Sequence, residues 1–187
     1  MKRNCIIGII SALFLLWSST ALGQKVAVKT NLLYDATATA NLGVEVGLAP
    51  KWTLDLSGNL NAWTIKEGKR WKQWVVQPEA RYWTCERFSG HFFALHALGG
   101  QFNFGGIPLF GLENTRKQGW MAGAGLGYGY SWILSRHVNL ELELGVGYVH
   151  SRYDQFECEG CGRKIAENQK GHYFGPTKAA LNLVFAF

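Results

Sequence analysis

The sequence has 187 residues, of which 48% are hydrophobic and 14% aromatic, and its formal net charge is +6 at neutral pH. This length suits one domain with a sizeable core and is short for two. The positive surplus is mild and its cations fall mostly in segments that we expect to be connections, so the composition does not indicate a partner made of nucleic acid.

Residues 1–23 have the organisation of a secretory signal peptide. Lys2 and Arg3 form a charged start, an apolar run follows at 6–17, and small residues at 21–23 suit a signal peptidase. The apolar run is shorter than the roughly 20 residues of a spanning helix, and Cys5 precedes it, which argues against a membrane anchor and against a lipoprotein. We therefore expect residues 24–187 to form one exported domain.

From residue 26 onward, apolar residues recur mainly at every second position, which places them on one face of a β-strand. The pattern predicts eight strands, in chain order at 26–34, 42–48, 52–56, 74–82, 91–103, 120–132, 138–148 and 179–187. Many of them have the roughly 9–11 residues that a tilted strand needs to cross a bilayer.

The predicted connections alternate between short and long. Short ones are expected at 49–51, 84–90 and 134–137, long ones at 63–72, 104–118 and 149–172, and one barely longer than a turn at 35–40. Short turns on one side and longer loops on the other are typical of outer-membrane barrels.

Two further features favour a membrane barrel over a soluble β-sandwich. Tryptophans lie near predicted strand ends, where aromatic side chains line membrane interfaces; they are Trp52, Trp63, Trp71, Trp74, Trp83, Trp120 and Trp132. The last strand carries Phe185 and Phe187 on one face, an ending typical of strands delivered to the barrel-insertion machinery. The sequence therefore predicts an all-β fold, an eight-stranded antiparallel up-and-down transmembrane β-barrel.

Proline and glycine interrupt the pattern in two places. Pro78 lies inside a predicted strand and cannot donate a ladder hydrogen bond, so we expect a bulge or local break there. Glycines alternate over 123–129 and recur at Gly145 and Gly147, on the face predicted to point inward. They indicate room for bulky inward side chains and tight curvature, with a small ligand cavity as the alternative.

The faces opposite the apolar ones carry charges of both signs. An eight-stranded barrel has an interior that side chains just fill, and buried charges without partners are costly, so we expect these residues to pair. The predicted lumen charge network comprises Lys29, Glu45, Asp55, Glu79, Arg81, Glu141, Glu143 and Lys178, with His96 near it. Acid–base catalysis by two of these carboxylates, or a passive pore, is a weaker alternative.

Three cysteines remain after the signal peptide. Cys158 and Cys161 fall in the longest predicted connection and indicate a local disulfide in an exported protein. Their spacing also suits half of a zinc site, but no second pair follows, so neither a metal nor a cofactor is predicted. Cys85 lies in a short turn at the opposite rim and is left over.

Five stretches carry a family resemblance: KTNLLY at 29–34, WVVQPEARYWTC at 74–85, GGQFN at 99–103, QGW at 118–120 and YFGPTK at 173–178. They resemble an uncharacterised family of small outer-membrane proteins from Bacteroidales, catalogued as a domain of unknown function, over nearly all of the mature chain. The resemblance implies an outer-membrane location and an association with fimbrial or adhesin genes, and it implies no catalytic residues.

We expect a non-enzymatic barrel with a structural, anchoring or adhesive role. The expected partners are the lipid bilayer and its lipopolysaccharide, the barrel-insertion machinery, and a surface or fimbrial protein. Cations of the predicted outer loops would meet lipid phosphate or an acidic partner; they are Lys66, Lys69, Arg70, Lys72, Arg116, Lys117, Arg152, Arg163, Lys164 and Lys170.

Two other classes of function stay open. One is a lipid-modifying barrel enzyme, suggested by His150 and Ser151 with Asp154 nearby, although a trio local in sequence is a weak indication. The other is a carrier of a small apolar ligand, which needs an internal cavity.

Overall fold

Alternating side chains produce the expected strands in the computed structural model, which describes residues 25–62, 64–66, 69–107, 112–157 and 162–187. The predicted signal peptide therefore lies outside the described residues. The elements are β1 (Val26–Asn31), α2 (Leu32–Ala36), β2 (Ala40–Ala49), β3 (Trp52–Asn61), β4 (Thr64–Lys66), β5 (Lys69–Trp83), β6 (Gly90–Ile107), β7 (Leu112–Ile133), β8 (Val138–Phe156) and β9 (Lys164–Ala186). The one helix of the described chain is too short to cross a membrane.

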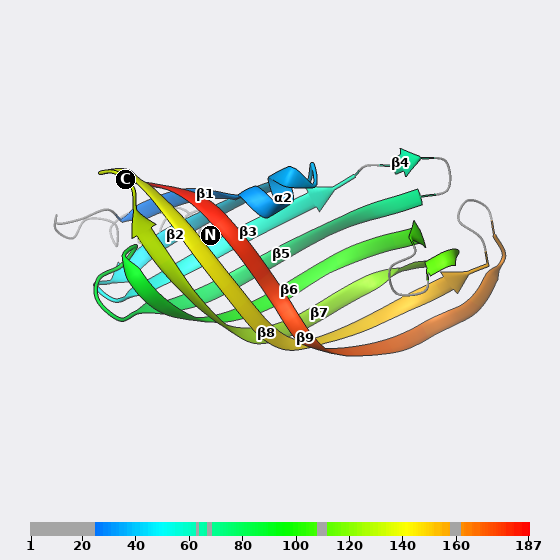
Figure 1. The fold of residues 1–187 in the computed structure, drawn as a ribbon. Coiled ribbons are helices and arrows are strands. Elements are labelled where there is room, and N and C mark those ends of the chain that lie inside the picture. Colours follow the sequence, from blue (N-terminus) through cyan, green and yellow to red (C-terminus); the bar gives the residue numbers. More distant parts are fainter. Residues whose placement is uncertain (1–24, 63, 67–68, 108–111, 158–161) are drawn as a thin grey trace, which may run out of the picture.

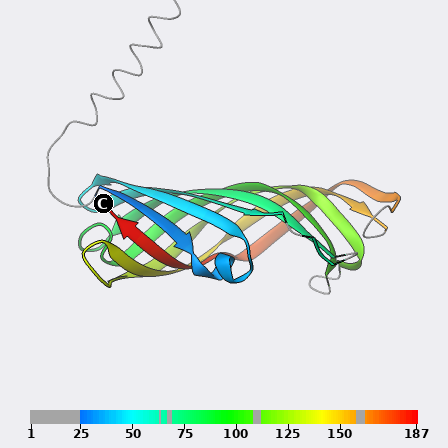
Figure 2. The same ribbon diagram turned by 90° about the horizontal axis from the view of Figure 1, so that it is seen from above.

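The strands form a closed ring (Figures 1 and 2). Each long strand pairs antiparallel with the next one in the chain, β3 pairs with β5, and β1 pairs with β9. The short strand β4 adds only to the end of β5. The prediction of an all-β fold with eight antiparallel strands is thereby confirmed, and the ring has an interior into which alternate side chains point.

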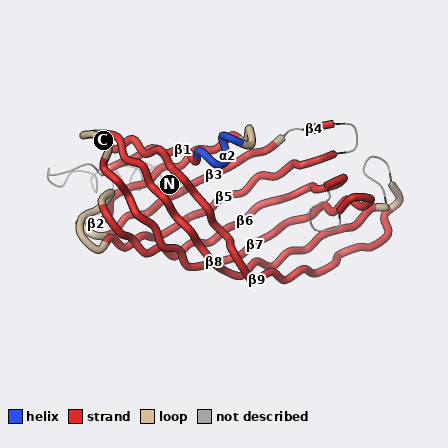
Figure 3. Tube along the Cα trace, in the orientation of Figure 1, coloured by secondary structure: helices blue, strands red, loops and turns tan. Residues whose placement is uncertain are grey.

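The two ends of the ring differ (Figure 3). Three short turns, β2–β3, β5–β6 and β7–β8, lie at one end, together with the end of β9; we call this the turn end. At the other end β1 pairs with β9 only as far as Asn31 and Asn182, whereas β8 and β9 stay paired as far as Phe156 and Lys164. The strands β5 to β9 therefore continue past the closed ring as a curved extension.

This extension corrects the expected long connections. Most of 104–118 and 149–172 is paired strand, and β4 and β5 occupy much of 63–72. Polar residues are mixed there with aromatic ones such as Trp71, Phe104 and Tyr153, so the period-two apolar pattern fades while the backbone ladder continues.

The first predicted strand also ends early. Residues 26–34 were expected to be one strand, but β1 stops at Asn31, whose side chain accepts a hydrogen bond from the backbone N of Leu33 and caps α2. An asparagine at this position favours helix initiation because it pairs with an otherwise unbonded N–H.

A local break occurs at Pro78, as one of the two expected outcomes, and no bulge forms there. Gln77 and Pro78 are not paired with β6, because proline cannot donate to the ladder, while the register is the same on either side of them, with Val76 opposite Gly99 and Glu79 opposite His96. On the other side Pro78 pairs with Leu56 of β3. The register instead shifts on β9, where Gly145 is opposite Lys178 and Val146 is opposite Pro176.

An apolar layer fills the interior near the turn end. Its members are Ala27, Trp83, Phe88, Phe92, Ala94, Val184 and Ala186. Trp83 was expected at a membrane interface, but it is fully buried and its indole N–H donates to Thr53 Oγ1 at 2.9 Å. The inward glycines make room as predicted, since a Cβ on Gly129 would lie 2.3 Å from Phe92 Cζ.

Candidate functional site

An ionic cluster fills the middle of the ring, and Arg81 of β5 is its centre. Its Nη1 lies 3.0 Å from Glu45 and 2.9 Å from Glu141, and its Nη2 lies 2.6 Å from Glu143. Its Nε donates to Glu79 of the same strand, and its guanidinium lies over the ring of Phe92. Such charge-assisted bonds are among the stronger hydrogen bonds in proteins.

Two lysines extend the cluster toward the end that carries α2. Lys29 of β1 donates to Glu45 and lies 3.4 Å from Asp55. Lys178 of β9 lies 2.6 Å from Glu79 and 3.2 Å from Glu143. The structure thus brings all eight residues of the predicted lumen charge network together.

The cluster holds more carboxylates than cations. Two carboxylates lack full pairing: Asp55 is buried and neither oxygen has a hydrogen bond, and Glu143 Oε1 has none. His96 lies beside the cluster, with Nε2 2.8 Å from Thr177 Oγ1. All five carboxylates are buried, and of these Asp55 lines a neighbouring space.

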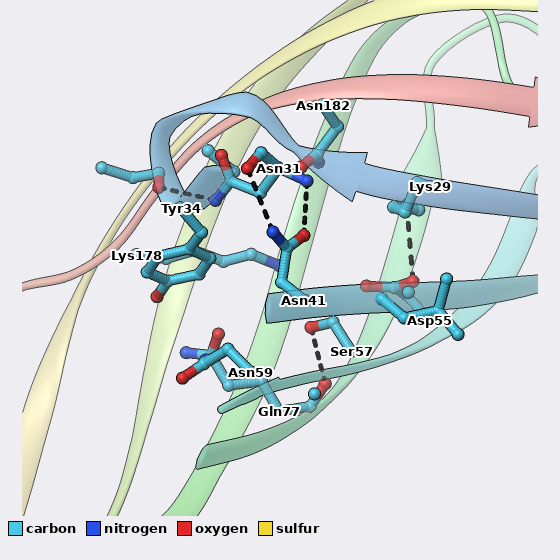
Figure 4. A pocket seen from close by; sticks show the side chains of 15 residues that line it. Lys29, Asn31, Tyr34, Asn41, Asp55, Ser57, Asn59, Gln77, Lys178 and Asn182 are labelled. Carbon is cyan, nitrogen blue, oxygen red and sulfur yellow. Dashed lines mark hydrogen bonds and ion pairs between the residues drawn. The ribbon is translucent and has the colours of Figure 1, made fainter. Parts of the chain in front are cut away.

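A small polar chamber lies next to the cluster, beneath α2 (Figure 4). Its volume is about 30 Å³, which is room for about two water molecules. Asp55, Ser57 and Asn59 line it along β3, and Tyr34 of α2 and Lys178 lie on the other side. Asp55 and the unpartnered Asn59 Oδ1 are the groups that such waters would satisfy.

The outward face of the ring is apolar. Leu126 on β7 is 65% exposed and Leu144 on β8 is 63% exposed. We call the following outward residues the apolar belt: Leu42, Val44, Leu54, Leu56, Val76, Phe93, Leu95, Leu126, Leu142, Leu144 and Val146.

Aromatic side chains flank the belt. Toward the turn end, Trp52 packs on Tyr82, Trp132 packs on Tyr130, and the hydroxyl of Tyr128 is 2.6 Å from His91 Nδ1. These side chains form the first of two aromatic rows.

Toward the extension lie Trp74 and Trp120, each 43% exposed, with a hydrogen bond between Tyr148 and His172 beside them. Trp52, Trp74, Trp120 and Trp132 therefore all face outward. Trp71 was also expected at the interface, but it faces inward, as the other odd positions of β5 do. It packs on Phe104.

The residues of the hydrolase alternative are not joined. His150 and Ser151 are neighbours on β8, so their side chains point to opposite faces. Ser151 Oγ lies 3.5 Å from the carbonyl of Gly171, while Asp154 accepts from the backbone N of Asn168 at 2.9 Å and pairs with Lys164 at 3.0 Å. His150 instead contacts the ring of His172, whose partner is a tyrosine hydroxyl.

The structure tests the predictions for the cysteines and for the last phenylalanines only in part. Cys158 and Cys161 lie outside the described residues, so their disulfide stays a prediction. Cys85 is exposed and free at the turn end, and in the described part of the chain no group of three His, Cys, Asp or Glu residues could hold a metal ion. Phe185 and Phe187 end the chain on the exposed side of β9, and their role in assembly also stays a prediction.

Sequence reasoning missed a groove on the outward face beyond Trp74 and Trp120, with a volume of about 560 Å³. Its lining comes from β3, β5, β6, β7 and β8, so it depends on the register of five strands. The sequence placed Trp74 and Trp120 near strand ends, but it did not show which residues of other strands lie beside them.

Comparison with known families finds one described as "Protein of unknown function (DUF3575)", which matches residues 9–187. Neither the curated proteins nor the solved structures include a match to the chain.

Proposed function

The chain belongs to the DUF3575 family, and we propose from the geometry of the chain itself that it is a non-enzymatic β-barrel of the outer membrane. The observation that carries this proposal is the exposed apolar belt around a ring whose charges are buried inside. A closed ring satisfies its backbone hydrogen bonds without water, and an apolar exterior is stabilised by lipid. Contiguous apolar surface of this kind is rare on soluble monomers.

The spacing of the aromatic rows supports this proposal. Trp132 and Trp120 lie on β7 on either side of the belt, twelve positions apart. At about 3.3 Å per residue the strand between them is about 40 Å long. With the usual strand tilt of about 40°, this corresponds to about 30 Å along the membrane normal, which matches the hydrocarbon core.

The filled interior supports a structural or anchoring role. Ion pairs occupy the middle of the ring, and the chamber of about 30 Å³ beside them is far below the roughly 300 Å³ of a small-ligand site. Catalysis by the interior and carriage of an apolar ligand there are correspondingly disfavoured.

The extension gives the barrel a surface to present. In the proposed orientation the turn end faces the periplasm, and β5 to β9 project outward beyond the lipid with polar and aromatic residues. We propose that this extension anchors or displays a surface partner, such as a fimbrial protein, and that export through residues 1–23 and the barrel-insertion machinery deliver the chain.

Two arginine substitutions test the membrane proposal. Leu126 lies midway between the aromatic rows and Leu134 lies in a turn at the turn end, yet both are similarly exposed, 65% and 59%. In lipid, Leu126→Arg should cost about 2–4 kcal/mol and Leu134→Arg about 0–1 kcal/mol. The measurement is the free energy of urea unfolding from phosphatidylcholine vesicles.

A soluble protein would respond differently. Both variants would then change the free energy of unfolding by less than about 0.5 kcal/mol, as surface substitutions in water usually do. That result, or a wild-type chain that stays folded and monodisperse without detergent, would refute the proposal.

A further inference from the structure

Two cross-strand rows of outward side chains border the groove of about 560 Å³. The row nearer the belt is Trp74, Gln101 and Trp120, and the next row is Lys72, Asn103, Gln118 and Asp154. The positions between the rows, residues 60–62 around the end of β3, and Phe156 of β8 complete the lining. Its volume falls within the range of small-molecule sites, roughly 300–1,000 Å³.

The lining of the groove combines flat aromatic rings with amides. Trp74 and Trp120 present indole surface, and Trp74 Nε1 donates to Gln101 Oε1 at 3.3 Å, which leaves the amide N–H groups of Gln101 to donate elsewhere. Asn103 donates to Gln118 at 3.5 Å, but its own Oδ1 is buried without a hydrogen-bond partner. An unpaired buried acceptor is costly until a ligand donates to it, and a hydroxyl would do so.

Two cations adjoin the groove. Arg152 is opposite Trp120 on one side and opposite Lys170 on the other, and both cations are exposed. Like charges in this arrangement repel, and neither forms an ion pair within the described part of the chain. The nearby carboxylate of Asp154 is already held by Lys164 and by the backbone of Asn168.

A phosphate would neutralise this pair of cations. Its oxygens suit the planar guanidinium of Arg152 in a bidentate arrangement, with Lys170 as a second charge. Lys72, which is exposed at the other end of the groove, is a third cation, and unlike Arg152 and Lys170 it is part of the lining.

We propose that the groove binds the phosphorylated sugar headgroup of an outer-leaflet glycolipid. Trp74 and Trp120 pack against the sugar, the amides bond its hydroxyls, and Arg152 with Lys170 holds the phosphate. This inference rests on the proposed function, because the groove lies at headgroup depth only if the belt is in lipid. It adds a binding site and the residues that would hold each part of the ligand.

The test uses the full-length protein in phosphatidylcholine nanodiscs, with native mass spectrometry to measure binding. The probes are bis-phosphorylated lipid A, dephosphorylated lipid A and phosphatidylglycerol. Arg152→Gln with Lys170→Gln should weaken binding of the phosphorylated lipid A by about 10- to 100-fold, because two charge-assisted contacts are lost.

The matched control is Lys51→Gln with Lys117→Gln, which removes the same charge elsewhere. Lys51 bonds a carbonyl at the turn end, and Lys117 lies over the ring of Tyr153 on the inward face. Binding by this variant should equal that of the wild type. Equal losses in both double variants, or equal binding of the two forms of lipid A by the wild type, would overturn the phosphate site.

Phosphatidylglycerol separates sugar recognition from a general affinity for phosphate. If it binds as tightly as phosphorylated lipid A, the sugar part of the proposal is overturned. Insertion is scored separately by the shift of unheated protein on SDS gels, so a chain that fails to insert refutes the proposed function rather than the groove alone.

Photocrosslinking provides a second measurement that does not depend on removing charge. Gln101→p-benzoylphenylalanine lies between the two tryptophans of the groove and should capture lipid A. The same substitution at Lys117, on the inward face, should not. Equal capture at both positions would contradict the proposal.

Discussion

At the residue scale, the sequence pattern predicts which way the side chain of Arg81 points but not which residues it contacts. Period two places it on the inward face with other charged residues, and the structure agrees. The pattern does not reveal that its partners come from β2, β5 and β8, because this depends on ring closure and register. The prediction for Trp83 fails for a different reason: its nearness to a turn indicated an interface, although its odd position on the same strand as Arg81 already placed it inside.

Removing Arg81 should strongly destabilise the folded protein. Arg81→Ala leaves four buried carboxylates without their shared cation, and losing one partner of a buried ion pair costs about 3–5 kcal/mol. Urea unfolding in detergent micelles, followed by tryptophan fluorescence, measures the loss.

The control for this prediction is Arg152→Ala, which removes an exposed arginine. Without added glycolipid it should change the free energy of unfolding by less than about 0.5 kcal/mol. Similar stabilities for the two variants would show that Arg81 is not the centre of a paired interior.

At the scale of elements, the middle of each strand is predictable and its far end is not. All eight strands appear where alternation is strict, because there one face is apolar. The extension mixes polar with aromatic residues and has no continuous apolar face, so its paired strands were predicted to be loops. The start of α2 and the register shift on β9 depend on single side chains and tertiary contacts, which periodicity does not report.

Asp154 gives the extension a dependence on pH. Hydrogen bonds from the backbone of Asn168 and from Lys164 hold the pKa of the Asp154 carboxyl below its ordinary value. Its contribution is therefore complete above the unfolded pKa and is lost as pH falls through the lower folded pKa. The amide resonance of Asn168 should titrate with a midpoint below about 3.9, as measured by NMR in micelles.

Asp154→Asn is the matched variant. It should abolish this titration and leave the global unfolding transition unchanged, because the contact lies beyond the closed ring. A midpoint at or above the ordinary value would mean that the hydrogen bonds do not form.

At the scale of the whole molecule, an even number of alternating strands predicts the ring, whereas the ion pairs and the groove follow from register. The groove needs positions from five strands to meet, and no local pattern in the sequence contains that information. The sequence predicted that the interior would hold paired charges, but not which residues would pair with which.

A filled interior should not conduct ions. We expect no discrete current steps when the folded protein is added to a planar lipid bilayer in about 1 M potassium chloride, because eight strands leave an interior that side chains fill. Protein denatured by heat before addition serves as the control. Regular steps from the folded protein alone would show that the ion pairs open.

The ionic cluster also has a consequence for assembly. Lys29 reaches carboxylates on β2, β3 and β8, and Arg81 reaches β2, β5 and β8, so no single hairpin contains all the partners of either cation. Within the cluster the β2–β3 hairpin, with Glu45 and Asp55, has a net negative charge. A half-built sheet that entered lipid would carry bare charge into hydrocarbon, which is expensive. If the ring lies in a membrane as proposed, we therefore expect its strands to insert together and not hairpin by hairpin.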